Sequence, residues 1–273
     1  MDDLTALEIV NLLTVGMASF NIKSQAPNDI PTHNQFIKPD NLKSQDNLNI
    51  INQWTEKNKM LINQKKSKTM IFNFTQNYQF TTRLQLNGVS LEVIPKTKLL
   101  GVIIQNDLKW DENTASLVKR ANARMVIWQK LSEFGAPRED MKITYISYIR
   151  SILEQSCVVW QSSHTTENKE DLTRVQKTSC RIILKNRYNS YEKALESLDL
   201  EDLNERRDKL CKLFARKAAK SSNPHFKLIE NPYTMKLRNP KTYQVTHCNT
   251  EQLKMSAVPQ MQRMLNKIHQ EDK

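Results

Sequence analysis

Residues 117–131 read LVKRANARMVIWQKL, and from this run onward the sequence pattern is helical. Five apolar side chains in the run recur every three or four residues, which places them on one face of a helix: Leu117, Ala121, Met125, Trp128 and Leu131. A second set with similar spacing follows: Met141, Tyr145, Tyr148, Ile149 and Ile152. Pro137, just after Gly135, separates the two sets, because proline does not continue a helix. The sequence therefore predicts two consecutive helices with a break between them.

The helices predicted downstream are basic. Residues 168–185 predict a helix in which four cationic side chains share one face: Arg174, Lys177, Arg181 and Lys185. Residues 201–220 predict another, in which cations such as Arg206 and Arg207 alternate with apolar residues. A row of this kind can follow a phosphate backbone, and a solvated helix face is the alternative reading. Prolines interrupt the sequence after residue 221, and one short terminal helix is predicted at 258–268.

The sequence before Trp110 mixes helix and strand patterns. Apolar residues at helical spacing predict a helix over 40–59, capped by Asp40. Residues 60–63 and 69–74 read as strands, and residues 98–104 as a further strand rich in β-branched residues. The dipeptide Asn87-Gly88 is a strong signal for a β-hairpin turn. The predicted fold class is therefore α+β.

The basic excess is unevenly distributed along the 273 residues. The formal net charge is +12, with −1 carried by residues 1–65 and +13 by the remainder. Such an excess suggests a polyanionic partner, either nucleic acid or an acidic membrane surface, with an ordinary solvated surface as the alternative. No transmembrane or secretory segment is visible, so we expect an intracellular protein, cytoplasmic or nuclear.

The spacing of the cysteines and histidines and the small number of glycines exclude several kinds of binding site. The four cysteines and five histidines are too scattered for a disulfide framework or a zinc site, so we expect them to be structural or surface residues. With four glycines in the chain, a P-loop or a Rossmann fingerprint is excluded. Carboxylates are left as the metal candidates.

Asp2 and Asp3 are adjacent carboxylates at the start of the sequence. Because adjacent carboxylates repel each other, the pair indicates a helix cap, a solvated terminus or a site for a divalent cation. The apolar residues 4–10 that follow fit either a strand or a capped helix. Residues 21–39 carry three prolines and indicate a linker or a long loop.

Several motifs, in this order, resemble the reverse transcriptase of jockey-type non-LTR retrotransposons. The first group comprises Asp2-Asp3, Trp54, Asn58, Leu61, Asn63, Lys66-Ser67-Lys68, Met70 and Phe72. The second comprises Leu99-Leu100-Gly101-Val102, Ile104, Leu108 and Trp110. The third comprises residues 148–155, Val159-Trp160, Val175-Gln176-Lys177, Cys180-Arg181 and residues 205–208. Asn249-Thr250-Glu251 and residues 256–259 and 263–266 resemble the terminal motif of these polyproteins. The resemblance covers nearly the whole chain.

The resemblance implies a truncated polymerase palm with short antiparallel strands over residues 1–112. A thumb-like basic helical region over 113–222 and an extended C-terminal arm over 223–273 would follow. Asp2 and Asp3 would be carboxylates of the catalytic turn and ligands of Mg²⁺, and Lys66 would lie near the incoming triphosphate. Leu99, Leu100, Gly101 and Val102 would grip the primer end.

The implied partners are an RNA template and a DNA primer, with no membrane and no small-molecule cofactor. A polymerase that copies any sequence should contact phosphate and sugar, and we expect such contacts from Arg174, Lys177, Arg181, Lys185, Arg206 and Arg207.

The resemblance also implies that part of the polymerase site is missing. Two-metal nucleotidyl transfer needs carboxylates from two separate strands, and no residue of this sequence matches the second. We therefore expect no polymerase activity from this chain alone. Gln105 and Asn113 stand where the family often has an acidic residue and a histidine. A non-catalytic nucleic-acid-binding remnant and a translated pseudogene are the alternatives.

Overall fold

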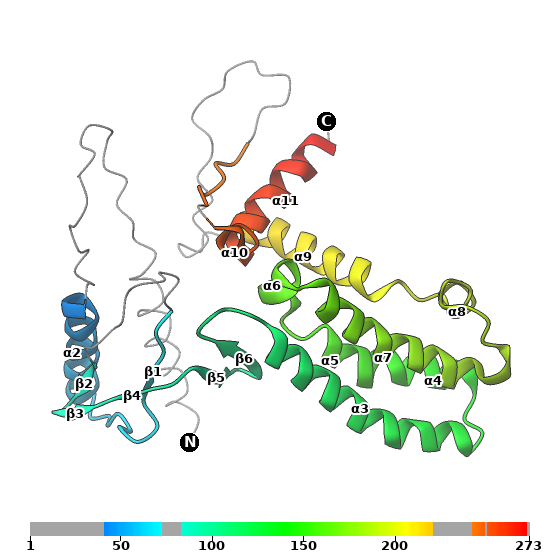
Figure 1. The fold of residues 1–273 in the computed structure, drawn as a ribbon, viewed down its shortest axis with the longest axis horizontal. Helices are drawn as coiled ribbons and strands as arrows, with labels where there is room; N and C mark the ends of the chain where they lie inside the picture. The colour runs from blue at the N-terminus through cyan, green and yellow to red at the C-terminus, as the bar shows by residue number, and fades with distance from the viewer. Residues whose placement is uncertain (1–40, 73–82, 221–241, 249, 272–273) are drawn as a thin grey trace. The chain divides into compact units, whose positions relative to one another are not determined.

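The structure, a computed structural model, describes residues 41–72, 83–220, 242–248 and 250–271 (Figure 1). It divides into two compact units between Leu108 and Lys109, here the N-terminal unit and the C-terminal unit. The described residues are mostly helical, with a few short strands in small sheets, which agrees with the predicted α+β class. The predictions for residues 4–10 and 21–39 lie outside the described residues. None of the described helices is long and apolar enough to cross a membrane.

In the N-terminal unit a helix packs on a β-hairpin. Helix α2 (Asn41–Lys57) places Leu48 against Leu86 and Leu91 in a small apolar core. The hairpin joins β2 (Gln85–Leu86) to β3 (Val89–Ser90) through Asn87 and Gly88, both at positive φ, as the sequence predicted. The Gln45 side-chain amide donates to the carbonyl of Gln85 at 2.7 Å and accepts from its N–H at 2.8 Å. The Gln45 side chain therefore provides hydrogen-bond partners for both backbone groups of Gln85 in β2.

Two strand predictions need correction. Residues 60–63 form no strand, because Met60 N–H donates to the carbonyl of Thr55 and the Asn63 carbonyl accepts from the turn that follows. Within the described part of 69–74, the strand is limited to β1 (Lys68–Thr69), which pairs in parallel with β4 (Glu92–Val93). The backbone groups of Met60 and Asn63 are used by turns, which local strand propensity does not report.

The predicted single strand over 98–104 is a hairpin. Strands β5 (Lys96–Leu99) and β6 (Val102–Gln105) pair in antiparallel register, with Leu99 opposite Val102. Leu100 and Gly101 form the two-residue turn, at φ 47° and 85°. Two central residues at positive φ match the twist of a β-hairpin, so the chain reverses here.

The described secondary-structure elements of the C-terminal unit are all helices (Figure 1). Its elements are α3 (Asp111–Glu133), α4 (Arg138–Thr144), the π-helix η1 (Tyr145–Arg150), α5 (Ser151–Leu153), α6 (Cys157–Trp160), η2 (Gln161–Ser163), α7 (Thr166–Leu184), η3 (Lys185–Arg187), α8 (Tyr191–Leu198), α9 (Leu203–Lys220), α10 (Glu251–Lys254) and α11 (Ala257–Glu271). Helix α3 lies along α7, and α9 packs against α6, α7 and α11. The break at Gly135 and Pro137, the helix at 168–185 and the terminal helix are confirmed.

The core of this unit follows the predicted faces with two exceptions. Leu117, Ala121, Met125 and Trp128 of α3 are buried, as are Met141, Tyr145, Ile149 and Ile152 of α4, η1 and α5. Leu131 is 43% exposed, because the buried stripe of α3 continues through Ser132 instead. Tyr148 is 38% exposed, since the wider turn of the π-helix rotates it off the buried face.

A chain segment beside α11 is held by side-chain amides. Asn266 accepts from the Tyr243 N–H at 2.8 Å and donates to its carbonyl at 2.9 Å, and Gln262 accepts from the Thr246 N–H at 2.8 Å. Gln262 and Asn266 are one helical turn apart and both are buried. Because the amides pair with backbone groups, they provide hydrogen-bond partners for the N–H and carbonyl of Tyr243 and for the N–H of Thr246.

Candidate nucleic-acid interface

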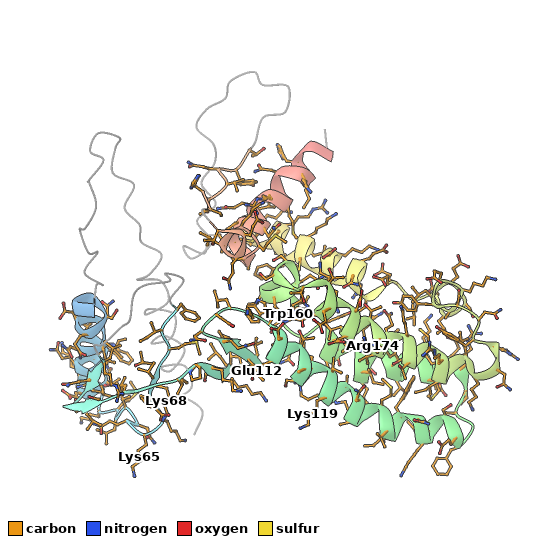
Figure 2. The ribbon with its side chains drawn as sticks, in the orientation of Figure 1. Lys65, Lys68, Glu112, Lys119, Trp160 and Arg174 are labelled. Carbon is orange, nitrogen blue, oxygen red and sulfur yellow. The ribbon has the colours of Figure 1, made fainter. Side chains whose placement is uncertain are left out.

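Among the predicted site residues of the N-terminal unit, Lys66, Leu100 and Gly101 lie in turns, whereas Leu99 and Val102 belong to strands. Asp2 and Asp3 lie outside the described residues. Lys66 is exposed in a turn, where its N–H donates to the carbonyl of Asn63 at 3.1 Å. Figure 2 shows Lys65 and Lys68 along the same stretch of chain, and the Lys68 ammonium pairs with Glu92. This turn exposes a short basic segment.

The predicted primer-grip residues form the tip of the β5–β6 hairpin. Leu100 is 71% exposed, whereas Val102 is buried and Leu99 is half-buried. The hairpin therefore holds two of the four residues inward and displays one leucine at its tip. An exposed leucine at positive φ is unusual, because the left-handed conformation costs a side-chain-bearing residue about 1–2 kcal/mol.

Three of the four predicted cations, Arg174, Lys177 and Arg181, lie on α7, and Lys185 directly follows its last residue. The helix begins at a Thr165 cap, whose hydroxyl accepts from the Asn168 N–H, and it buries residues including Leu172, Val175 and Ile183. Arg174 is 71% exposed and carries an ion pair of 2.9 Å with Asp171 (Figure 2). Because an exposed ion pair contributes little stabilisation, a phosphate can replace Asp171 as the partner of Arg174.

The next two cations of the row lie over tyrosine rings. The Lys177 ammonium is 5.1 Å from the centre of the Tyr191 ring, and the Arg181 guanidinium is 5.2 Å from that of Tyr188. Cation–π contacts hold charges at fixed positions while leaving N–H groups for other acceptors. Tyr188 and Tyr191 were not predicted as site residues. The sequence signal for them is a pair of tyrosines within a polar stretch just after the basic row.

Lys185 ends the row in a structural role. Its ammonium donates to the Ser132 carbonyl at 2.8 Å, so it satisfies a group near the C-terminus of α3. Its own backbone is at φ 49° at the end of α7. The exposed Arg187 follows in η3. The described row is therefore Arg174, Lys177 and Arg181, with Arg187 beyond it.

A polar network fixes Tyr191 relative to α7 and to the residues that lead into α9. The Tyr191 hydroxyl lies 2.7 Å from the Gln176 side-chain oxygen and 3.0 Å from a carboxylate oxygen of Asp202. Burial, followed by the charge of Asp202, raises the pKa of Tyr191, so the phenol stays protonated as a donor. Gln176 also donates to the carbonyl of Glu201 at 2.9 Å. The ring under Lys177 is thereby held by hydrogen bonds to α7 and to the residue that precedes α9.

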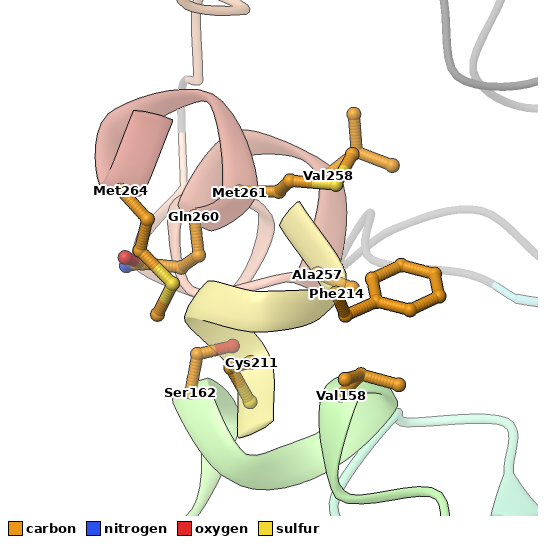
Figure 3. A pocket seen from close by; sticks show the side chains of 9 residues that line it. All are labelled: Val158, Ser162, Cys211, Phe214, Ala257, Val258, Gln260, Met261 and Met264. Atoms are coloured by element: carbon orange, nitrogen blue, oxygen red, sulfur yellow. The ribbon is translucent and has the colours of Figure 1, made fainter. Parts of the chain in front are cut away.

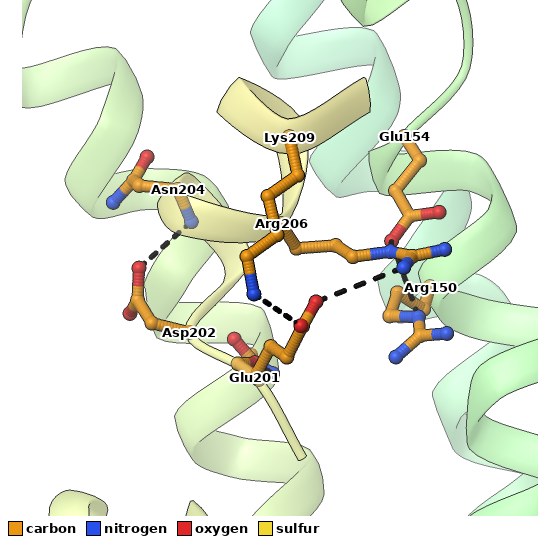
Figure 4. A network of polar contacts seen from close by, with 8 residues as sticks. Arg150, Glu154, Glu201, Asp202, Asn204, Arg206 and Lys209 are labelled. Carbon is orange, nitrogen blue, oxygen red and sulfur yellow. Dashed lines mark hydrogen bonds and ion pairs between the residues drawn. The ribbon is translucent and has the colours of Figure 1, made fainter. Parts of the chain in front are cut away.

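Arg206 belongs to an ion-pair network (Figure 4). Its guanidinium contacts Glu154 at 3.3 Å and Glu201 at 3.7 Å, and Arg150 contacts the same Glu154 oxygen at 3.2 Å. Lys209 contacts the other oxygen of Glu201, and its hydrogen bond is the first cause that lowers the pKa of Glu201. Arg206 thus connects α9 to Glu154 through an ion pair.

Arg207 is fully buried, contrary to the expectation that it contacts nucleic acid. Its Nε donates to Gln161 at 2.7 Å, one of its terminal nitrogens donates to Asn204 at 2.5 Å, and burial lowers its pKa. The sequence pattern misplaced it because seven Lys and Arg residues on one helix look alike until the packing of α9 is known. A guanidinium sealed from solvent cannot reach a phosphate, so Arg207 is not retained as a contact.

His164 forms part of the same buried region. Its ring stacks on Trp160 with a centroid distance of 4.3 Å, and its Nε2 lies 3.2 Å from the Thr114 hydroxyl. That hydroxyl donates to the Trp110 carbonyl at 2.9 Å, so Nε2 is the donor to Thr114 and carries the ring proton. Burial, followed by the charge of Arg207, lowers the pKa of His164 to about 3.

Among the residues that the structure describes, no group of three or more His, Cys, Asp and Glu side chains is placed to hold a metal ion. Comparisons of the chain with protein-family models, with curated proteins and with solved structures find no match.

Proposed function

We propose that this chain is a segment of a retrotransposon-type reverse transcriptase and that its C-terminal unit binds an RNA–DNA duplex through phosphate contacts. The observation that carries the binding proposal is the row Arg174, Lys177 and Arg181 along α7, in which Arg174 and Arg181 are exposed and Lys177 is half-buried. The sequence resemblance supports the parent enzyme and the kind of duplex. Catalytic roles for Asp2, Asp3 and Lys66 in the intact parent enzyme, where Mg²⁺ would supply Lewis-acid chemistry, are part of the same proposal.

The row suits a polyanion for electrostatic reasons. Its three cations project at successive turns of a helix that rises about 1.5 Å per residue, so neighbouring charges lie at spacings comparable to those of backbone phosphates. The tyrosines beneath Lys177 and Arg181 limit the side-chain entropy lost on binding. Helix α9 adds exposed cations at Lys212, Lys217 and Lys220.

Fluorescence anisotropy with a labelled RNA–DNA hybrid tests the binding. Each phosphate contact that is lost should lower the slope of log affinity against log salt by about 0.9. The triple variant R174Q/K177Q/R181Q should therefore reduce the slope by about 3 and weaken binding at low salt. K267Q on α11, also an exposed cation, is the matched control and should leave the slope unchanged. A wild-type affinity that does not respond to salt would contradict the proposal.

Primer extension tests the catalytic part separately. With Mg²⁺, deoxynucleotides and a primed RNA template, the purified chain should give no extension, because the second strand of metal-binding carboxylates has no match in this sequence. A chain that binds the hybrid without extension fits both a polymerase segment and a non-catalytic remnant. If the wild-type chain extends the primer and the D2N variant does not, the chain is a polymerase by itself.

A further inference from the structure

Cys157 and Cys211 lie against each other in the C-terminal unit. Cys157 begins α6, and Cys211 lies within α9, whose residues pack directly on α6. The Cys211 sulfur is 3.9 Å from the Cys157 carbonyl oxygen. Both side chains are buried, and both are free thiols in this structure. The two thiols are 54 positions apart in the sequence and are brought together by the fold.

A groove lies beside this pair. Cys211 lines it together with Val158 and Ser162 from one side, and Met261 and Met264 of α11 from the other. Figure 3 shows Cys211 on the wall of the groove, on the side of α9 toward Val158 and Ser162. Cys211 is therefore the thiol of the pair that borders this groove, and Cys157 lies directly beside it in the interior.

The two thiols differ in character. A hydrogen bond from the Cys211 thiol is the first cause that lowers the pKa of Cys157, and the charge of the buried Arg207 acts in the same direction. The same hydrogen bond and burial raise the pKa of Cys211. Cys180, which is buried without such partners, has its pKa raised to about 11 by burial. A thiolate beside a cation is the reactive form of cysteine, which makes Cys157 the nucleophile of the pair.

We propose that Cys157 and Cys211 are a redox-active pair that hydrogen peroxide closes into a disulfide between α6 and α9. The Cys157 thiolate attacks one peroxide oxygen, the O–O bond breaks, and the departing hydroxide takes a proton to become water. The sulfur of Cys211 then attacks the Cys157 sulfenic acid, the S–O bond breaks, and hydroxide leaves with the Cys211 proton as a second water. Two thiols are oxidised by two electrons in total, and one peroxide is reduced to two waters.

Peptide mapping of the full chain tests the pair directly. Trypsin releases each of the four cysteines in a separate peptide, because Lys or Arg residues lie between them. The reduced protein is exposed to hydrogen peroxide, free thiols are blocked with N-ethylmaleimide after denaturation, and the peptides are analysed by mass spectrometry. We expect a linked pair of peptides containing Cys157 and Cys211, a mass loss of about 2 Da, and full reversal by dithiothreitol. Cys180 should remain a blocked thiol.

Two variants assign the roles. In C211S, dimedone should label Cys157 as a trapped sulfenic acid, whereas C157S should leave Cys211 unoxidised at the same peroxide concentration. Cys248, which is partly exposed, is the internal reference for simple accessibility. Oxidation of Cys248 while Cys157 and Cys211 both stay reduced in the wild-type chain would overturn the proposal, as would a disulfide that joins either of them to another cysteine. The wild-type mapping decides the question even where a variant fails to fold.

Discussion

The guanidinium carbon of Arg207 lies 5.6 Å from the centre of the Trp160 ring, in the interior of the C-terminal unit. Both side chains are fully buried, and they join α9 to α6. A buried cation is tolerated only where hydrogen bonds and nearby charges replace water. Gln161 links the Arg207 guanidinium to a negative charge. Its side-chain oxygen accepts from Arg207, and its side-chain nitrogen donates to the carboxylate of Asp208 at 3.0 Å.

Removing this cation should destabilise the unit strongly. We expect R207A to lower the free energy of unfolding by roughly 3 kcal/mol, because a large side chain and two buried hydrogen bonds are lost together. Urea unfolding followed by tryptophan fluorescence measures the change. K212A, an exposed lysine on the same helix, is the matched control and should stay within about 0.5 kcal/mol of wild type. A loss below 1 kcal/mol for R207A would show that the arginine is dispensable.

His164 should make the stability depend on pH. Its pKa is about 3 in the folded chain against 6.5 for the unfolded reference, so between these values the unfolded state binds a proton that the folded state does not. The free energy of unfolding should therefore fall as the pH decreases from about 6.5 toward 3, by an amount on the order of 1–2 kcal/mol at pH 5. Urea unfolding at several pH values should show a shallower decline for H164Q. Equal slopes for the two proteins would contradict the assignment.

Glu154 is the shared carboxylate of Arg150 and Arg206, so its charge should matter more than that of an exposed acid. We expect E154Q, which keeps the shape, to lower the free energy of unfolding by about 1–2 kcal/mol, because two guanidinium groups lose the negative charge that they share. E251Q breaks an exposed pair with Lys254 and should cost less than about 0.5 kcal/mol. Thermal unfolding compares the two variants, and equal effects would rule out a special role for Glu154.

The turn at Leu100 and Gly101 should be improved by asparagine. Leu100 is at φ 47° and is 71% exposed, so L100N relieves backbone strain without loss of packing. We expect a gain of about 0.5–1 kcal/mol, measured as slower hydrogen exchange of the β5 and β6 amides. L61N changes a leucine that is 87% exposed and should leave these amides unaffected. Faster exchange in L100N would mean that the leucine side chain stabilises the hairpin.

Local sequence patterns predicted most of the helices and the Asn87-Gly88 hairpin. The α3 face from Leu117 to Trp128 and the start of α4 after Pro137 follow from spacing and from the chemistry of proline, which act over a few residues. Strands were predicted less well. The turn at Leu100 lies inside a run with strong strand propensity, and residues 60–63 use their backbone groups in turns, so propensity alone misjudged both.

The sequence by itself determined that the chain has basic helices, and it placed Arg174, Lys177 and Arg181 on one face of α7, because helical spacing is a local property. Only the tertiary structure decided which cations are available. Arg206 pairs with Glu154, Arg207 lies on Trp160, and these contacts join residues about 50 positions apart in the sequence. Burial depends on which helices pack together, and a single helix pattern carries no information about its neighbours.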